Sequence, residues 1–276
     1  MQFVNMILDW KRQWFQALIL VTIIILNICV DVPKWITSWI AQGSIGFESL
    51  KIEWQILIRI GRWGIFLAMF FFVLSKIRKA NADVVIRQTA HAIVWHSYFG
   101  YCCCRYILGY KTLSLIRVPI SKQFQIVCHN LFDVDKKELQ EIAKKDEDDV
   151  KVSYYNNSFY SSEIVLILSD TYQLDRDKID IDGLKNLKTV VIDRSSDDHT
   201  RYYSPEFISA INNEIHHLPS NVETIHLFAT MNPSNCYHAA SEVFMTGGRD
   251  SWKHLHVYEQ NKDTWKFDGK KRVKVF

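Results

Sequence analysis

The stretch ALILVTIIILNICV at residues 17–30 carries no charged side chain, and WGIFLAMFFFVL at residues 63–74 is a second run of the same kind. A helix that crosses a bilayer needs about 17–25 predominantly apolar residues. Both runs reach this length when they are extended toward their N-terminal sides, to residues 14 and 55. The sequence therefore predicts a two-helix transmembrane hairpin, with spans at about residues 14–30 and 55–74.

Two other interpretations of the apolar runs stay open. A secretory signal peptide would explain the first run, but no small-x-small cleavage site follows Val30 and a second apolar run comes after it. A pair of buried helices in a soluble protein would also give runs of this length.

Basic residues flank the predicted hairpin on one side. Lys11 and Arg12 precede the first run, and Lys76, Arg78 and Lys79 follow the second. Positively charged flanks stay in the cytoplasm. We therefore expect a multi-pass protein of a bacterial inner membrane with both termini cytoplasmic and residues 31–53 outside.

Arg59 and Arg62 interrupt the second span, and their i, i+3 spacing places them on one helix face. Long basic side chains near a helix end can extend to the lipid headgroups. Alternatively, the two arginines line a polar seam when several hairpins assemble. They are the candidate residues for a function in the membrane.

Charge divides the chain into two segments. Residues 1–79 carry nine Lys/Arg and four Asp/Glu, a net charge of +5, and residues 80–276 carry 24 and 26, a net charge of −2. The second segment therefore lacks the bulk basic charge of a protein that binds DNA or RNA polymers. An anionic ligand would have to be bound by local geometry.

No metal, cofactor or catalytic site is predicted. The six cysteines, including the run Cys102–Cys104, match no zinc module and suit a reduced compartment. No G-x-S-x-G elbow, P-loop or H-E-x-x-H motif occurs. His254 and His256 lie on one face of a predicted strand, but no third ligand has motif spacing.

Residues 80–276 form the predicted cytosolic domain. In its first part the patterns favour helices at 84–98 and 135–144 and strands at 112–118, 124–128 and 150–155. In its second part they favour strands at 164–168, 189–192, 224–229 and 254–258, the last being the final strand. Helices fall between these strands. One begins at Ser204-Pro205-Glu206 and buries Phe207, Ile208, Ile211 and Ile215; another follows residue 234. This alternation predicts a Rossmann-like α/β sheet with parallel strands.

Ligands of open α/β sheets bind beyond the carboxyl ends of the strands. Three loops should meet there: Ser169, Asp170, Thr171 and Tyr172; residues 193–203; and Thr230, Met231, Asn232, Pro233 and Ser234. The last loop leads into a helix N-terminus, which favours phosphate. The same loop would also serve as an ordinary helix cap. Tyr172, Tyr202 and Tyr203 either stack on a base or pack in the core.

The segments 164–170, 224–234 and 255–260 resemble the central strand, ligand loop and final strands of a SAVED domain. That resemblance implies two fused CARF-like halves in residues 80–276 that bind a cyclic oligonucleotide. Fused to two transmembrane helices, such a domain would be a membrane effector of CBASS anti-phage defence. In the first half, the ligand loop is expected at residues 130–133.

On this resemblance we expect a ligand, a cyclic di- or trinucleotide, to bind through residues 169–172 and 230–234 and to drive head-to-tail oligomerisation. The gathered hairpins would then disrupt or perforate the membrane and cause cell death or growth arrest. One alternative is a membrane-tethered nuclease or hydrolase regulated by a nucleotide. Another is a scaffold that recruits a partner.

Overall fold

The computed structural model describes residues 2–29, 52–87, 97–135, 137, 139, 149–156, 161–174, 176, 179, 181, 183–194, 201–245, 252–261, 264 and 266–276. The chain divides into two compact units. We call residues 1–89 with 99–111 the helical unit, and residues 90–98 with 112–276 the sheet unit. Each is described by itself.

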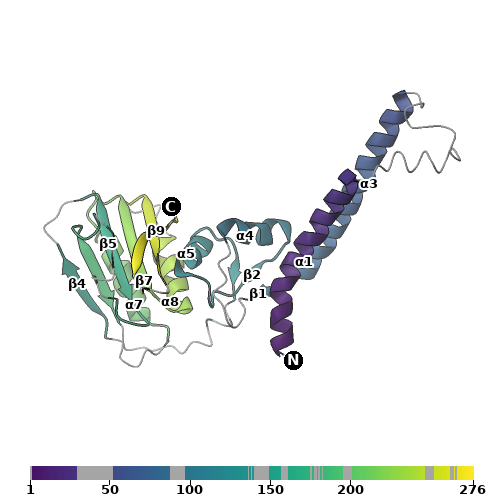
Figure 1. Cartoon of the computed structure of the whole chain (residues 1–276). Coiled ribbons are helices and arrows are strands. Elements are labelled where there is room, and N and C mark those ends of the chain that lie inside the picture. The colour runs from purple at the N-terminus through teal and green to yellow at the C-terminus, as the bar shows by residue number, and fades with distance from the viewer. Residues whose placement is uncertain are drawn as a thin grey trace. The chain divides into compact units, whose positions relative to one another are not determined.

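The helical unit is built on two long helices, α1 (Gln2–Cys29) and α3 (Ile52–Asn81), which run side by side in Figure 1. Gln16, midway along α1, bonds to Asn81 at the end of α3, and Asn27 near the end of α1 bonds to Arg62. The two helices are therefore antiparallel, as the hairpin prediction requires. The outer loop expected at residues 31–53 lies almost wholly outside the described residues.

The second helix is longer than predicted. It continues seven residues past Leu74, through Lys76, Arg78 and Lys79, and ends at Asn81. Lysine, arginine and alanine are good helix formers, so the charged end adds turns instead of stopping the helix. Among the described helices, the stretch Ile60–Asn81 is long and apolar enough to cross a membrane, with a mean hydropathy of 1.6, and Gln13–Cys29 is a shorter apolar helix.

Shorter elements complete the helical unit. These are β1 (Val85–Ile86), α4 (Tyr98–Cys102), whose first residue is grouped with the sheet unit, and the π-helix η2 (Cys103–Ile107). The helix predicted at 84–98 is wrong at its start, because the β-branched Val85 and Ile86 adopt extended backbone. Residues 88–96 of that prediction lie outside the described residues.

The sheet unit contains a six-stranded sheet in the order β4-β6-β5-β7-β8-β9. Its strands are β4 (Lys151–Tyr155), β5 (Glu163–Ser169), β6 (Thr189–Asp193), β7 (Thr224–Thr230), β8 (His254–Gln260) and β9 (Phe267–Lys274). The four central strands are parallel, and the edge strands β4 and β9 run antiparallel to their neighbours. The α/β class and the parallel core predicted from the sequence are confirmed.

Helices connect the parallel strands. α7 (Pro205–His216) links β6 to β7, and α8 (Pro233–His238) continues into the π-helix η4 (Ala239–Phe244) before β8. Ser204 caps α7 by accepting a bond from Phe207 N at 3.2 Å, as predicted, and the four predicted apolar residues of α7 are buried. In Figure 1, α7 and α8 lie over one face of the sheet. Val165 and Ile167 face the other side, in a cluster with Leu174, Ile179 and Phe267.

Two strand predictions are wrong. Residues 124–128 belong to a helix, α5 (Ile120–Cys128), which begins after Pro119 and buries Phe124, Ile126 and Val127. A run that is apolar at nearly every position does not distinguish a buried strand from a buried helix, and Pro119 was the missed signal. The strand predicted at 112–118 shrinks to β2 (Thr112–Leu113), which pairs in parallel with β3 (Asp133–Val134).

The prediction that β8 is the final strand is also wrong, because β9 follows it along the sheet edge. β9 reads FDGKKRVK, and its charged residues hide the strand pattern. Phe267 at its start is completely buried. The helix predicted at 135–144 falls mostly outside the described residues.

Candidate functional site

The strand register brings two of the predicted ligand loops together at the carboxyl end of the sheet. Ser169 at the end of β5 pairs with Asp193 on one side and Thr230 on the other. The backbone amides of Asp170 and Thr171 both donate to the carbonyl oxygen of Thr230, at 3.1 and 3.0 Å. Residues 169–172 and 230–234 therefore form one structure.

A buried ion pair lies at the centre of this structure. Asp170 is 1% exposed, and its Oδ1 accepts a bond from Arg194 Nε at 2.6 Å. Its Oδ2 accepts three bonds, from Asn232 N (2.8 Å), Asn232 Nδ2 (3.0 Å) and Asn235 Nδ2 (3.0 Å). Burial raises the pKa of the Asp170 carboxyl, and Arg194 and the Asn232 and Asn235 donors oppose that rise. We call Asp170, Arg194, Asn232 and Asn235 the ion-pair cluster.

The helix N-terminus predicted to hold phosphate already has an acceptor. Asn232 Oδ1 accepts bonds from Ser234 N at 2.9 Å and Asn235 N at 3.0 Å. The amide groups of Asn232 and Asn235 also donate to the carbonyl oxygen of Tyr202, and Ser204 N donates to Asn235 Oδ1. These bonds tie the loop after β7 to the start of α7. The first amides of α8 are therefore satisfied within the protein.

The nine predicted ligand-binding residues fall into two groups by exposure. Six are buried, namely Ser169, Asp170, Thr230, Met231, Asn232 and Ser234, and their side chains form the interior of the strand ends. Thr171, Tyr172 and Pro233 are half-buried and reach the surface. Tyr172 donates its hydroxyl to Gln260 Oε1 at 2.6 Å, which anchors the ring beside the end of β8.

Aromatic side chains lie near the start of α7 and on α8. Tyr202 is buried, and the Arg194 guanidinium lies 4.0 Å from its ring centroid. Its ring therefore packs against the ion-pair cluster. Tyr203 is half-buried and its ring lies 4.3 Å from that of His238 on α8, at an angle of 31°. Of the two tyrosines expected after β6, Tyr203 is therefore the accessible one.

Sequence reasoning did not single out Arg194, Asn235 or His238, although Arg194 belongs to the loop 193–203 that it expected at this edge of the sheet. Arg194 directly follows β6 just as Asp170 directly follows β5. Opposite charges at the same end of adjacent parallel strands were a signal that could have paired them. Asn235 and His238 had no comparable signal, because their partners lie in distant segments.

In the helical unit, the structure places one of the two predicted arginines. Arg62 donates from Nε to Asn27 Oδ1 at 3.1 Å and lines an otherwise apolar pocket of about 260 Å³ with Asn27, Ile65 and Phe66 among others. Arg59 lies on α3, but its side chain is outside the described part of the chain. The Arg62–Asn27 bond therefore joins α3 to α1.

A comparison with curated protein sequences gives no match. Among solved structures, the chain is similar to the Acinetobacter baumannii Cap4 SAVED/CARF-domain containing receptor. The complex of that receptor with the cyclic trinucleotide 3′3′3′-cAAA matches with a TM-score of 0.46 and 10% identity, covering 76% of this chain and 56% of that one. The complex with 2′3′3′-cAAA matches with a TM-score of 0.42 and 9% identity, covering 63% and 40%. The chain thus spans about half the length of these structures or less.

The sequence model of one family matches nearly the whole chain. The match runs over residues 2–276, and the family is described as the SMODS- and Ubiquitin system-associated 2TM effector domain. The predicted class, a membrane effector with two transmembrane helices, is thereby confirmed. The chain belongs to the SMODS- and Ubiquitin system-associated 2TM effector family.

Proposed function

We propose that the chain is a receptor and effector in one: the sheet unit binds a cyclic di- or trinucleotide, and the helical unit then disrupts a membrane. The observation that carries this proposal is the distribution of side chains on the helix pair, which is apolar outside and polar inside. Most of the exposed large apolar side chains of the described residues lie on α1 and α3, while Gln16, Asn27 and Asn81 are buried.

An apolar exterior of this extent requires a partner. Burial of apolar surface is worth roughly 25 cal/mol per Å², and monomeric soluble proteins rarely expose patches above a few hundred Å². Lipid satisfies such a surface, whereas water does not. Since the family is a two-transmembrane effector, we place α1 and α3 in the bilayer with both chain termini in the cytoplasm.

In the sheet unit, we propose a ligand surface over the carboxyl end of the sheet. Its contacts would come from the half-buried Thr171, Tyr172 and Pro233, with Tyr203 beside them. Buried members of the two loops would hold these contacts in place, whereas the amides of Ser234 and Asn235 at the start of α8 already donate to Asn232 Oδ1. The ligand class follows from the resemblance of the strand and loop motifs to SAVED domains.

Ligand binding is tested by calorimetry of the full-length protein in detergent against a panel of cyclic di- and trinucleotides. At least one member should bind, and Tyr172→Ala should weaken it by roughly 5- to 100-fold if the ring stacks on a base. The matched control is Tyr155→Ala. Tyr155 pairs with Thr189 at the start of β6, so it lies at the opposite end of the sheet. Equal effects of both changes, or no binding at all, would refute the proposed surface.

For the output, we propose that occupied sheet units associate head to tail and gather their hairpins, so that Arg59 and Arg62 line a hydrated seam. The double change Arg59→Leu with Arg62→Leu should leave nucleotide affinity intact and abolish membrane damage. Membrane damage that persists in this variant would refute the hydrated seam and would indicate that the apolar surface of the hairpin causes the damage. Replacing residues 1–79 by an unrelated anchor separates this proposal from a tethered enzyme, which would keep its effect.

A further inference from the structure

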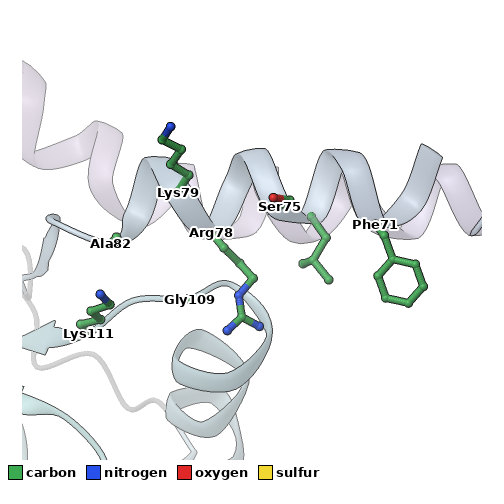
Figure 2. A pocket seen from close by; sticks show the side chains of 8 residues that line it. Phe71, Ser75, Arg78, Lys79, Ala82, Gly109 and Lys111 are labelled. Atoms are coloured by element: carbon green, nitrogen blue, oxygen red, sulfur yellow. The ribbon is translucent and has the colours of Figure 1, made fainter. Parts of the chain in front are cut away.

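A basic pocket of about 520 Å³ lies beside the last turns of α3, within the helical unit. Its lining residues on α3 are Phe71, Leu74, Ser75, Arg78 and Lys79, and Ala82, Gly109 and Lys111 complete it. The α3 residues follow the i, i+3, i+4, i+7 spacing of one helix face. Figure 2 shows Phe71 and Arg78 projecting from the same side of α3, with Arg78 reaching toward the segment that carries Gly109 and Lys79 pointing away from it.

Close packing holds the segment 106–111 against α3. Gly109 has a φ of +79°, and a Cβ added there would lie 2.9 Å from Arg78 Cβ, so the backbone approaches α3 as only glycine allows. Arg78 Nη1 donates to the carbonyl oxygen of Tyr106 at 2.9 Å, and Asn81 Nδ2 donates to that of Leu108 at 2.9 Å. These two bonds hold the segment 106–111 beside the pocket and fix the position of the Arg78 guanidinium.

The pocket is apolar at one end and cationic at the other. Phe71 is 60% exposed and lies within the apolar stretch Ile60–Asn81. Arg78 uses one nitrogen for Tyr106 and keeps further N–H donors, since a guanidinium has five. Lys111 is exposed, and in the described part of the chain no carboxylate pairs with its ammonium. Residues 75–111 carry six Lys/Arg and one acid, Asp83.

We propose that this pocket binds the headgroup of an anionic phospholipid. The phosphodiester would lie between Arg78 and Lys111, and an acyl chain would run along Leu74 and Phe71 toward the apolar part of α3. Continuity with this apolar surface favours a lipid over a free nucleotide, which has no acyl chain to cover Phe71. The inference rests on the membrane-embedded hairpin of the proposed function, and it assigns that hairpin a lipid requirement.

The lipid would act as a clamp between α3 and the segment 106–111. Its two charged contacts come from different parts of the chain, Arg78 from the helix and Lys111 from the segment beyond Gly109. Loss of the lipid would therefore leave two like charges in the pocket without an anion. Anionic lipid should therefore stabilise the contact between α3 and the segment 106–111.

The test is native mass spectrometry of the full-length protein in detergent with equal amounts of phosphatidylglycerol and phosphatidylcholine. Wild-type protein should retain phosphatidylglycerol in preference to phosphatidylcholine, and Lys111→Gln should lower that preference about fivefold, the contribution of one lysine near an anionic surface. Lys76→Gln is the matched control, because Lys76 is on the same helix but lies over the Phe72 ring and outside the pocket. It should keep the preference.

Three outcomes would overturn the lipid site: equal retention of both lipids by the wild type, an equal effect of Lys76→Gln and Lys111→Gln, or displacement of phosphatidylglycerol by a cyclic trinucleotide. Flotation of the same proteins with phosphatidylcholine vesicles measures membrane insertion by itself. It therefore distinguishes failure of the lipid site from failure of the proposed function. A protein that inserts without selecting its lipid refutes the pocket alone, whereas a protein that does not insert refutes the hairpin.

Discussion

In the helical unit the exposed side chains of α1 and α3 are largely apolar and the buried ones include Gln16 and Asn81, whereas in the sheet unit the core is apolar and the buried charged side chains include the Asp170–Arg194 pair. Gln16 and Asn81 are neutral, and they exchange two hydrogen bonds at 3.0 and 2.9 Å. Asp170 and Arg194 are charged and almost completely buried.

We attribute this difference to the solvent proposed for each unit, lipid for the helical unit and water for the sheet unit. In a bilayer, apolar contacts between helices gain little over contacts with lipid, so packing and interhelical hydrogen bonds hold the helices together. In water, apolar burial stabilises the sheet unit, and a buried ion pair there costs desolvation unless every charge is bonded. Removal of a buried polar group is thus expected to lower the unfolding free energy in both units, but by a different amount in each.

The largest effect should come from breaking the ion-pair cluster. Asp170→Ala leaves Arg194 buried without its partner, and removal of one member of a buried pair costs about 3–5 kcal/mol of unfolding free energy. Hydrogen exchange of β5 and β7, together with denaturant unfolding of the sheet unit, would measure the loss. Glu223→Ala is the control, since Glu223 forms an exposed pair with Lys253 at 2.7 Å and should change little. Similar stability of both variants would mean that the cluster does not hold the strand ends.

A smaller effect is expected from the amide pair of the helical unit. Asn81→Leu removes the bonds to Gln16 and to the Leu108 carbonyl and should weaken the α1–α3 pair by about 1–2 kcal/mol. Unfolding in mixed detergent micelles, followed by helical circular dichroism, would report it. Combining Asn81→Leu with Gln16→Leu should cost less than the sum of the two single changes.

Thr22→Leu provides the control for the amide pair. Thr22 is an exposed polar residue of α1, so its replacement adds apolar surface where lipid is expected. It should leave the helix pair unchanged or strengthen it. A loss as large as that of Asn81→Leu would contradict a lipid-facing exterior for α1.

The smallest effect should be a pH dependence restricted to the sheet unit. Burial and the positive charge of Arg272, with His226, His254 and Lys274, lower the pKa of His256 to about 4. Burial also lowers the pKa of His226, which Glu163 opposes. Unfolded histidine titrates at a pKa of about 6.5, so the unfolded state binds more protons below that pH. Stability is therefore fully present above pH 6.5 and falls as the pH decreases toward 4.

Hydrogen exchange at pH 7 and pH 5 would measure this effect unit by unit. Protection of the sheet unit should fall at pH 5, after correction for the intrinsic exchange rate, and His256→Gln should reduce the change. The described residues of the helical unit contain no histidine, so the protection of α1 and α3 should stay constant. An equal loss in both units would show that the histidines are not its source.

The sequence predicted those elements of the fold whose sequence signals are local. β5, β6, β7 and α7 were predicted because branched apolar runs and a Ser-Pro-Glu start are readable over a few residues. α5 was misread because an apolar run of five residues has no period, and β9 was missed because an edge strand can be mostly charged.

The site was predicted only in part, for the same reason. Convergence of the loops after β5 and β7 follows from parallel strands, and the structure has it. Asp170 accepts hydrogen bonds from Arg194, 24 residues away, and from Asn232 and Asn235, more than 60 residues away. Contacts over such separations have no local sequence signature. Nor does the bond between Gln16 and Asn81, which are 65 residues apart.

We propose, in short, that the sheet unit senses a nucleotide and the helical unit acts on the membrane. Dye release from vesicles containing the full-length protein, measured with and without the cyclic nucleotide that binds in calorimetry, tests this claim most directly. We expect release only when the nucleotide is present, and none from the Arg59→Leu, Arg62→Leu double variant. Release that is independent of the nucleotide, or no release from vesicles in which the protein is inserted and occupied, would contradict it.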